Sequence, residues 1–465
     1  MQTETKSPDL TKAASLLEQA EQLHGQGSPA ACRESIARAD EGLKALGITS
    51  KNEFGPAPLL AGRILLCRGN AQRDLRTPEG RTEALASYEH GLAAVATVAM
   101  PEDATPFDHQ LAANIMTNKG IALLQSDDAT TLREAVTWFE KSAAYRRTLP
   151  RDMHSVRWGL AAACMNRGDA LTRLGQPEDL QEAIRSYDEA VQCLEELAGF
   201  DHPPFIVRYA VAYMNRGHAL MAQNSPEGVA EAIKSFASAT AMMELHTQKD
   251  SMEYHGTMGC AMMCHAAALM EQGREQAGQV AEEARKAIAH VQHFEKEDLL
   301  STEVSIKARH LLCRALATML DRTPPDAPEV DEWITEVTDT VDEGMALERL
   351  WEQRGLEGFR LMAVELFRFG VRVFFIRQPH FLAEFILECL DPEQSPGAPV
   401  TSEEMHHLAG SVIWDAALNI EQRARGASVQ ERASLVEIVS DLHAADKRLQ
   451  ELREQYLGSS DPVVV

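Results

Sequence analysis

The tetrapeptide MNRG occurs twice in this chain, at 165–168 and again at 214–217. The residues that follow the two glycines match at eight further positions, so the duplication extends well beyond four letters. An internal repeat constrains the fold more than any other feature, because each copy must form one unit of an array. The matching pairs are Ala170/Ala219, Leu171/Leu220, Glu182/Glu231, Ala183/Ala232, Ile184/Ile233, Ser186/Ser235, Tyr187/Phe236 and Ala190/Ala239.

The pattern extends to seven copies over the first two thirds of the chain. We call the residue equivalent to the MNRG glycine the anchor of its copy. Neighbouring anchors are 48 to 51 residues apart. This regularity predicts a stack in which each unit contacts its neighbours. The anchors are Ala20, Gly69, Gly120, Gly168, Gly217, Ala266 and Ala315.

Each copy contains two amphipathic helical patterns. In the copy anchored at Gly168, apolar residues recur at spacings of three and four over 152–174 and again over 178–197. Gly and Pro residues at 175–177 separate the two patterns, and a second group at 199–204 ends the copy. A glycine at the anchor lets the partner helix approach the backbone closely, which offsets its cost of about 1 kcal/mol inside a helix.

These residues resemble the tetratricopeptide repeat family in a long-helix variant. The resemblance covers 11–325, although the usual unit has about 34 residues and this one has about 49. It implies an all-α, right-handed superhelical solenoid of antiparallel helix pairs, in which the first helix of each pair lines a concave groove. The family pattern is matched by Gly168, Ala170, Leu171, Gly175, Ala183, Tyr187 and Ala190.

The composition divides the chain into further segments. Seven of the 14 Phe residues lie just beyond the repeats, and the last helical pattern has an apolar and a charged face, which suits a cap on an open stack. We expect a disordered N-terminus at 1–10, the repeat array at 11–325, a Phe-rich helical region at 326–390, a flexible loop at 391–401, C-terminal capping helices at 402–456 and a tail at 457–465.

Charge and hydropathy exclude several classes of partner. The formal net charge of −25 argues against nucleic-acid binding, because the phosphate backbone repels an acidic surface. No stretch has the length and apolarity of a membrane span, and the N-terminus does not resemble a signal peptide. Eight scattered cysteines are typical of reduced core residues. We therefore expect a cytoplasmic location and no nucleic-acid or membrane partner.

The sequence contains no motif for catalysis or cofactor binding. A phosphate-binding loop, a dinucleotide fingerprint, an HExxH pair and a nucleophile elbow are all absent. Cys260 and Cys264 lie one turn apart with His265 adjacent, but no second pair of ligands follows at a suitable spacing. We predict no enzyme activity, no catalytic residue, no cofactor and no metal.

Asparagines near the anchors are candidate groove residues. Asn118, Asn166 and Asn215 stand two residues before their anchors, where three other copies have Cys, and we call these three the Asn ladder. Stacked copies place equivalent residues about 10 Å apart, so the ladder is suited to hydrogen-bond the backbone of an extended peptide. Directly after the anchors, Asn70, Asp169 and His218 are further groove candidates.

Cations stand one residue before the anchors and form a second ladder. In the groove, this cationic ladder would pair with carboxylates of a partner, bidentately where the residue is Arg. The alternative is structural: these side chains lie between copies and pair with acidic residues of the second helix, such as Asp188 or Glu189. The cationic ladder comprises Arg68, Lys119, Arg167, Arg216, His265 and Arg314.

The Phe-rich region is a possible second interface. Aromatic residues and Arg alternate there, and both are enriched at binding hot spots. The alternative is that these aromatic residues form a core. The candidates are Phe367, Arg368, Phe374 and Phe375.

The sequence as a whole predicts a non-enzymatic scaffold or regulatory adaptor that binds a peptide or partner protein in the groove. Two alternatives stay open. One is a ligand-responsive sensor that switches a partner. The other is a subunit or substrate of a larger enzyme complex, such as a protease system.

Overall fold

The computed structural model describes residues 8–48, 50, 54–98, 105–150, 153–197, 203–355, 358–391 and 403–456. These residues form eighteen α-helices and two short 3-10 helices, and they contain no strand. The predicted all-α fold of antiparallel helix pairs is therefore confirmed. The chain divides into two compact units, Met1–Gly228 and Val229–Val465.

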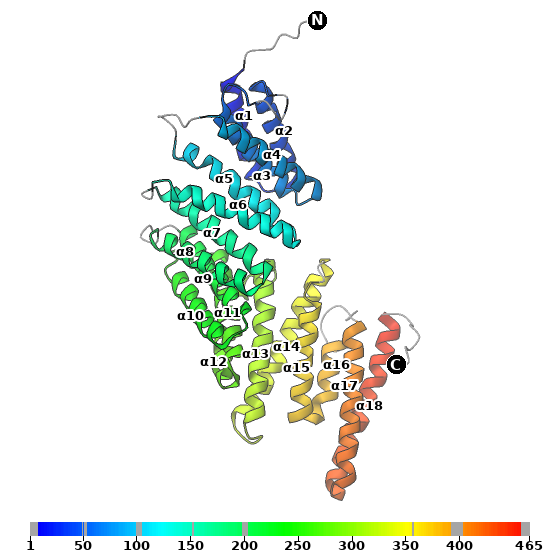
Figure 1. Cartoon of the computed structure of the whole chain (residues 1–465). Coiled ribbons are helices and arrows are strands. Elements are labelled where there is room, and N and C mark those ends of the chain that lie inside the picture. The colour runs from blue at the N-terminus through cyan, green and yellow to red at the C-terminus, as the bar shows by residue number, and fades with distance from the viewer. Residues whose placement is uncertain are drawn as a thin grey trace. The chain divides into compact units, whose positions relative to one another are not determined.

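The first unit is a run of paired helices (Figure 1). All seven anchors lie on odd-numbered helices, two of them in the second unit. The helices of the first unit are α1 Leu10–His24, α2 Pro29–Ala45, α3 Pro58–Asp74, α4 Pro78–Ala96, α5 Pro106–Leu123, α6 Ala129–Arg147, α7 His154–Leu174, α8 Pro177–Glu195 and α9 Pro203–Ala222.

Most of the second unit follows α10, Pro226–Met243, in which the division falls. The predicted loop at 391–401 lies outside the described residues except for Asp391, as do the tail at 457–465 and residues 1–7 of the predicted disordered N-terminus. The helices of the second unit are α11 Met252–Gln272, η1 Arg274–Gln276, α12 Ala277–Val291, α13 Leu299–Arg322, α14 Glu329–Gln353, α15 Arg360–Arg377, η2 Pro379–Phe381, α16 Leu382–Leu390, α17 Glu403–Gly426 and α18 Val429–Tyr456.

Local chemistry fixes where the helices begin and end. Ser28 and Thr77 accept hydrogen bonds from the backbone N–H three residues later, and a Pro follows each of them at the first helical position. At the end of α7, Gly175 adopts φ 71° and donates its N–H to the carbonyl of Leu171. Because a left-handed residue cannot continue an α-helix, the chain turns there into α8.

The helices of the first unit lie in two layers. From α1 to α9 each helix packs on its neighbour in sequence, and each odd-numbered helix from α1 to α7 also contacts the next odd-numbered helix. Among the described residues of this unit, the even-numbered helices do not contact one another to a comparable extent. The more closely spaced row lies on the inside of a curved stack, so the odd-numbered helices form the inner layer of this unit.

The anchor glycines bring the two helices of a pair together over a buried aromatic ring. Nineteen residues after each of Gly69, Gly120 and Gly168 stands a fully buried Tyr88, Phe139 or Tyr187. A Cβ atom at these glycines would lie 2.5, 2.5 and 2.6 Å from the rings. Only glycine fits, which explains why the sequence tolerates it inside a helix.

Candidate functional site

One stripe of side chains runs along the inner-layer helices of the first unit. Positions −6, −2 and +1 relative to the anchor are separated by four and three residues, so they share one face of a helix. We call these positions on α3, α5, α7 and α9 the inner stripe. Its polar members are Arg63, Asn70, Asn114, Asn118, Asn166, Asp169, Asn215 and His218.

Asparagine is concentrated in this stripe. The chain has eight Asn residues, and five of them are Asn70, Asn114, Asn118, Asn166 and Asn215. Inside a helix, Asn costs about 0.6 kcal/mol relative to Ala. Helix stability therefore does not explain why five Asn residues lie on successive inner helices. We attribute their presence there to the hydrogen-bonding chemistry of the amide.

Two members of the Asn ladder are bonded to the preceding inner helix. Arg73 of α3 donates to Asn118 Oδ1 of α5 at 2.7 Å. Asn215 of α9 donates to Asp169 Oδ1 of α7 at 3.0 Å. These bonds run between odd-numbered helices, which places the ladder on the inner layer.

The residues after the anchors are held from the outer layer. Tyr88 of α4 donates to Asn70 Oδ1 at 2.9 Å, and Tyr187 of α8 donates to Asp169 Oδ1 at 2.6 Å. Burial raises the pKa of Asp169, although the hydrogen bonds from Tyr187 and Asn215 oppose the rise. The directions of Asn70 and Asp169 are thus fixed from within the fold.

Asn166 differs from the other two members of the ladder. It is partly exposed, and no described residue hydrogen-bonds its amide. The sequence explains this difference. Asn215 donates to Asp169, the residue that follows the preceding anchor. For Asn166 the residue that follows the preceding anchor is the apolar Ile121, which has no side-chain acceptor. Asn166 therefore offers an unused amide on the middle of the inner stripe.

The cationic ladder faces a different neighbour. In the first unit each of its members pairs with an acid on the preceding even-numbered helix, twenty residues after the previous anchor. The acids remain 41–66% exposed, so each pair contributes at most about 1 kcal/mol. The pairs are Arg68–Asp40 at 2.7 Å, Lys119–Glu89 at 2.8 Å, Arg167–Glu140 at 3.1 Å and Arg216–Asp188 at 2.6 Å.

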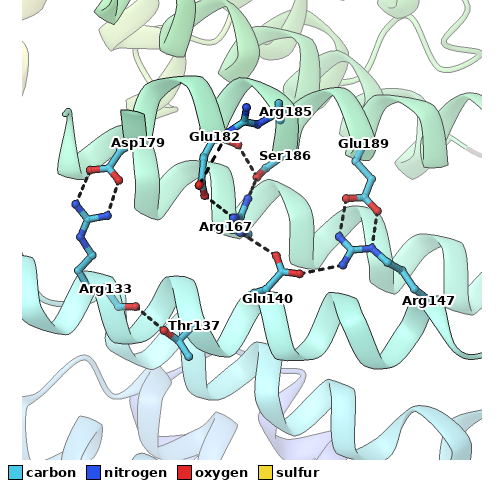
Figure 2. A network of polar contacts seen from close by, with 10 residues as sticks. All are labelled: Arg133, Thr137, Glu140, Arg147, Arg167, Asp179, Glu182, Arg185, Ser186 and Glu189. Atoms are coloured by element: carbon cyan, nitrogen blue, oxygen red, sulfur yellow. Dashed lines mark hydrogen bonds and ion pairs between the residues drawn. The ribbon is translucent and has the colours of Figure 1, made fainter. Parts of the chain in front are cut away.

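Figure 2 shows the pair around Arg167. The guanidinium lies between Glu140 of α6 and Glu182 of α8, and it also donates to Ser186. Its side chain is only 19% exposed. Contacts of this kind join consecutive copies, as the structural alternative for this ladder proposes.

In the second unit the cationic ladder is less regular. His265 contacts Glu283 of α12 at 3.3 Å, and the hydrogen bond from His265 is the main reason that the pKa of Glu283 is lowered. Arg314 contacts Glu271 of α11 at 3.4 Å, and both side chains are largely exposed. Here the contacts do not repeat a single pattern.

The Phe-rich candidates lie mostly inside the second unit. Phe367 and Phe374 are buried, and their rings stack against Phe385 with centroids 6.2 and 4.5 Å apart. Phe375 is partly buried against the same core. Arg368 is exposed and pairs with Glu365 one turn away on the same helix. A partner that approaches this face would therefore meet Arg368 before the rings.

Sequence reasoning missed two members of the inner stripe, Arg63 and Asn114. Asn114 stands four residues before Asn118, which donates to its backbone carbonyl at 2.9 Å, so the two side chains share a face of α5. The scarcity of Asn elsewhere in the chain was the signal that identifies it.

The described residues show neither a metal site nor a membrane-spanning helix. They contain no group of three or more His, Cys, Asp or Glu side chains placed to hold a metal ion. None of the described helices is long and apolar enough to span a bilayer. The eight cysteines are all free thiols, and six of them are buried.

Comparison with known proteins gives similarity of fold. No protein-family model and no curated protein matches the chain. A Rap protein complexed with competence and sporulation factor has 10% identity over 95% of this chain and 100% of that chain, with a TM-score of 0.38. Aspartyl phosphate phosphatase F from Bacillus subtilis has 13% identity over 97% of both chains, with a TM-score of 0.42. The human IFIT1 dimer with PPP-AAAA has 14% identity over 98% of this chain and 95% of that chain, with a TM-score of 0.29. These similarities concern the helical-repeat fold alone.

Proposed function

We propose that this chain is a non-enzymatic helical-repeat protein that binds an extended peptide segment of a partner along the inner stripe of its first unit. The concentration of asparagine on α3, α5, α7 and α9 carries this proposal. An amide donates and accepts at once, which matches the backbone of a peptide whatever its side chains. The protein would act as a scaffold or regulatory adaptor.

The spacing of the stripe suits an extended chain. Packed helices lie about 8 to 10 Å apart, and an extended peptide advances about 3.3 Å per residue. Equivalent side chains on neighbouring inner helices would therefore meet every third residue of the peptide. A ligand that reaches from Asn118 to Asn215 would span about six or seven residues. Because the inner helices are ordered before binding, little of the binding free energy is spent on ordering the protein.

Asn166 provides the test, because no described residue hydrogen-bonds its amide. Peptides would be selected from a displayed random library on the full-length protein, and the Kd of a selected peptide measured by fluorescence anisotropy. We expect Asn166→Ala to lose two hydrogen bonds to the peptide, or about 1 to 3 kcal/mol, which weakens binding roughly 5- to 150-fold. The melting temperature should stay the same or rise, because Ala is the better helix former.

Asn419→Ala is the matched control. Asn419 lies on α17 in the second unit, is exposed, and donates only to the carbonyl of Asp415 in its own helix. This variant should bind the peptide as the wild type does. Equal binding by the wild type and Asn166→Ala would reject the inner stripe as the binding surface.

A further inference from the structure

One core position of the first unit carries a charge. Twenty-six residues after the anchor, other copies have the buried aliphatic residues Leu46, Val95, Leu194 and Met243. In the copy anchored at Gly120 this position is Arg146, at the end of α6, and it is 3% exposed. A guanidinium has thus replaced an aliphatic side chain in an otherwise apolar series.

The surroundings of Arg146 are altered to receive it. Ser142 stands where other copies have Gly42, Gly91 or Ala190, and Thr117 stands where they have Leu66, Met165 or Met214. On α7, the guanidinium packs directly on Gly159, where a Cβ atom would lie 2.3 Å from Arg146 Nε. Three positions on three helices are therefore adapted to one side chain, which makes this a built pocket.

Neutral groups hold the guanidinium. Its Nη1 donates to Ser142 and to Thr117 Oγ1, the latter at 3.3 Å, and its Nη2 donates to Asn114 Oδ1 at 2.6 Å. Both hydroxyls hydrogen-bond the carbonyl of Ala113, at 2.9 and 3.0 Å, which turns their lone pairs toward Arg146. The buried Nε has no hydrogen-bond partner.

No described carboxylate pairs with this charge. By contrast, Arg133 and Arg147 on the same helix pair with Asp179 and Glu189 of α8 (Figure 2). Burial lowers the pKa of Arg146 to about 10. A buried cation without a counter-ion is costly unless something supplies one.

We propose that Arg146 receives a carboxylate of the bound peptide, an inference that rests on the proposed function and names a feature of its ligand. Nη2 is held only by Asn114, whose side chain belongs to the inner stripe and is partly exposed. Rotation of that amide uncovers Nη2 toward the inner face. The carboxylate then replaces a neutral acceptor with a charged one, and the hydrogen bond becomes part of a salt bridge between two ionised groups. Asp or Glu should therefore recur at one position of the peptides that bind.

Selection from two random eight-residue libraries tests the inference on the full-length protein. One library is fused to carrier at both ends and offers only side-chain carboxylates, whereas the other has a free C-terminus. Enrichment of Asp or Glu in both libraries assigns a side chain, and enrichment tied to the free end alone assigns the terminal carboxylate. A selected peptide should bind roughly 10- to 100-fold more tightly than its Gln-substituted or amidated counterpart.

Substitutions at Arg146 complete the test. Arg146→Met should abolish the difference between the acidic peptide and its neutral counterpart, and Arg146→Lys, which keeps the charge, should retain part of it. Arg185→Met is the control, because it makes the same change in net charge at an exposed site. The Arg185 side chain is 70% exposed, and its ion pair with Glu182 is long at 3.9 Å. This variant should leave the difference intact. Circular dichroism melting of each variant reports folding independently of binding.

The outcomes separate the two proposals. If the wild type selects no peptide, the proposed function and this inference both fail. If it selects peptides without an acidic preference, or if Arg146→Met keeps that preference in full, the inference alone fails and peptide binding stands.

Discussion

Two arginines on helix α6 allow a stability test in which the more exposed residue is expected to lose more unfolding free energy when it is replaced. Arg133 is 54% exposed and Arg146 is 3% exposed. Replacing either with Met removes one positive charge from the same helix of the same unit. Ordinary expectation assigns the larger cost to the buried residue. The contacts around the two side chains predict the reverse.

The magnitudes follow from what each substitution leaves behind. Arg133 donates to both carboxylate oxygens of Asp179, which is 7% exposed, so Arg133→Met leaves a buried carboxylate unpaired. Breaking a buried pair costs about 3 to 5 kcal/mol, and solvent near the exposed Arg133 reduces this to about 2 to 3 kcal/mol. Burial lowers the pKa of Arg146 to about 10, so the fold disfavours its charge by about 3 kcal/mol, which offsets three hydrogen bonds of about 1 kcal/mol each. Arg146→Met should therefore change stability by less than about 1 kcal/mol.

Urea denaturation followed by circular dichroism measures both variants, and hydrogen exchange identifies the unit that unfolds. The wild type and Arg185→Met serve as references. If Arg146→Met costs more than Arg133→Met, the charge of Arg146 is compensated within the fold, and the reasoning about this pocket is wrong.

Two further predictions concern the anchors and the histidines. Gly168→Ala should lower the free energy of unfolding by about 1 to 3 kcal/mol in urea denaturation, because the new methyl collides with Tyr187. At Gly410, inside α17, a new methyl would meet only an ordinary contact at 3.7 Å, so Gly410→Ala should raise the free energy of unfolding by about 1 kcal/mol. Equal effects of the two substitutions would contradict the packing argument. Burial and the neighbouring His255 lower the pKa of His290, so the unfolded chain binds the proton more readily, and stability should fall as the pH falls below about 6.5. Between pH 7.5 and 5, the melting temperature of His290→Gln should fall less steeply than that of the wild type. An unchanged slope would exclude His290 as the source of the pH dependence.

The fold was largely predictable because its information is local and repeated. Helical periodicity and Gly–Pro breakers are legible in single copies, and the anchor series places every first helix. The close approach expected at the anchor glycine is seen at Gly168, which packs against the ring of Tyr187. The division of the chain within α10 has no such signal. It falls inside the copy that begins with the second MNRG, and the composition does not change there.

The candidate site was predictable only in part. The Asn ladder and the cationic ladder stand at positions −2 and −1, which differ by about 100° around a helix. The two ladders therefore cannot both point in the same direction. The sequence does not state which of the two faces inward. The structure adds that Asn215 contacts Asp169 of the preceding odd-numbered helix, whereas Arg216 contacts Asp188 of the preceding even-numbered helix. The motif around the anchors does not point to Arg146, because Arg146 lies on the second helix of its copy. Its signal is the charge itself, since the equivalent positions of other copies hold Leu, Val or Met.

The pairs formed by the cationic ladder carry a consequence for how such a chain can change in length. In the first unit, each copy anchored at Gly69, Gly120 or Gly168 presents an acid to the copy after it and a cation to the copy before it, always from the same two positions. A duplicated segment of one copy therefore brings both halves of the junction with it and can join either neighbour without new mutations. Arrays built in this way can gain or lose whole segments by recombination, and the length of peptide that the protein accommodates would change in steps of about three residues.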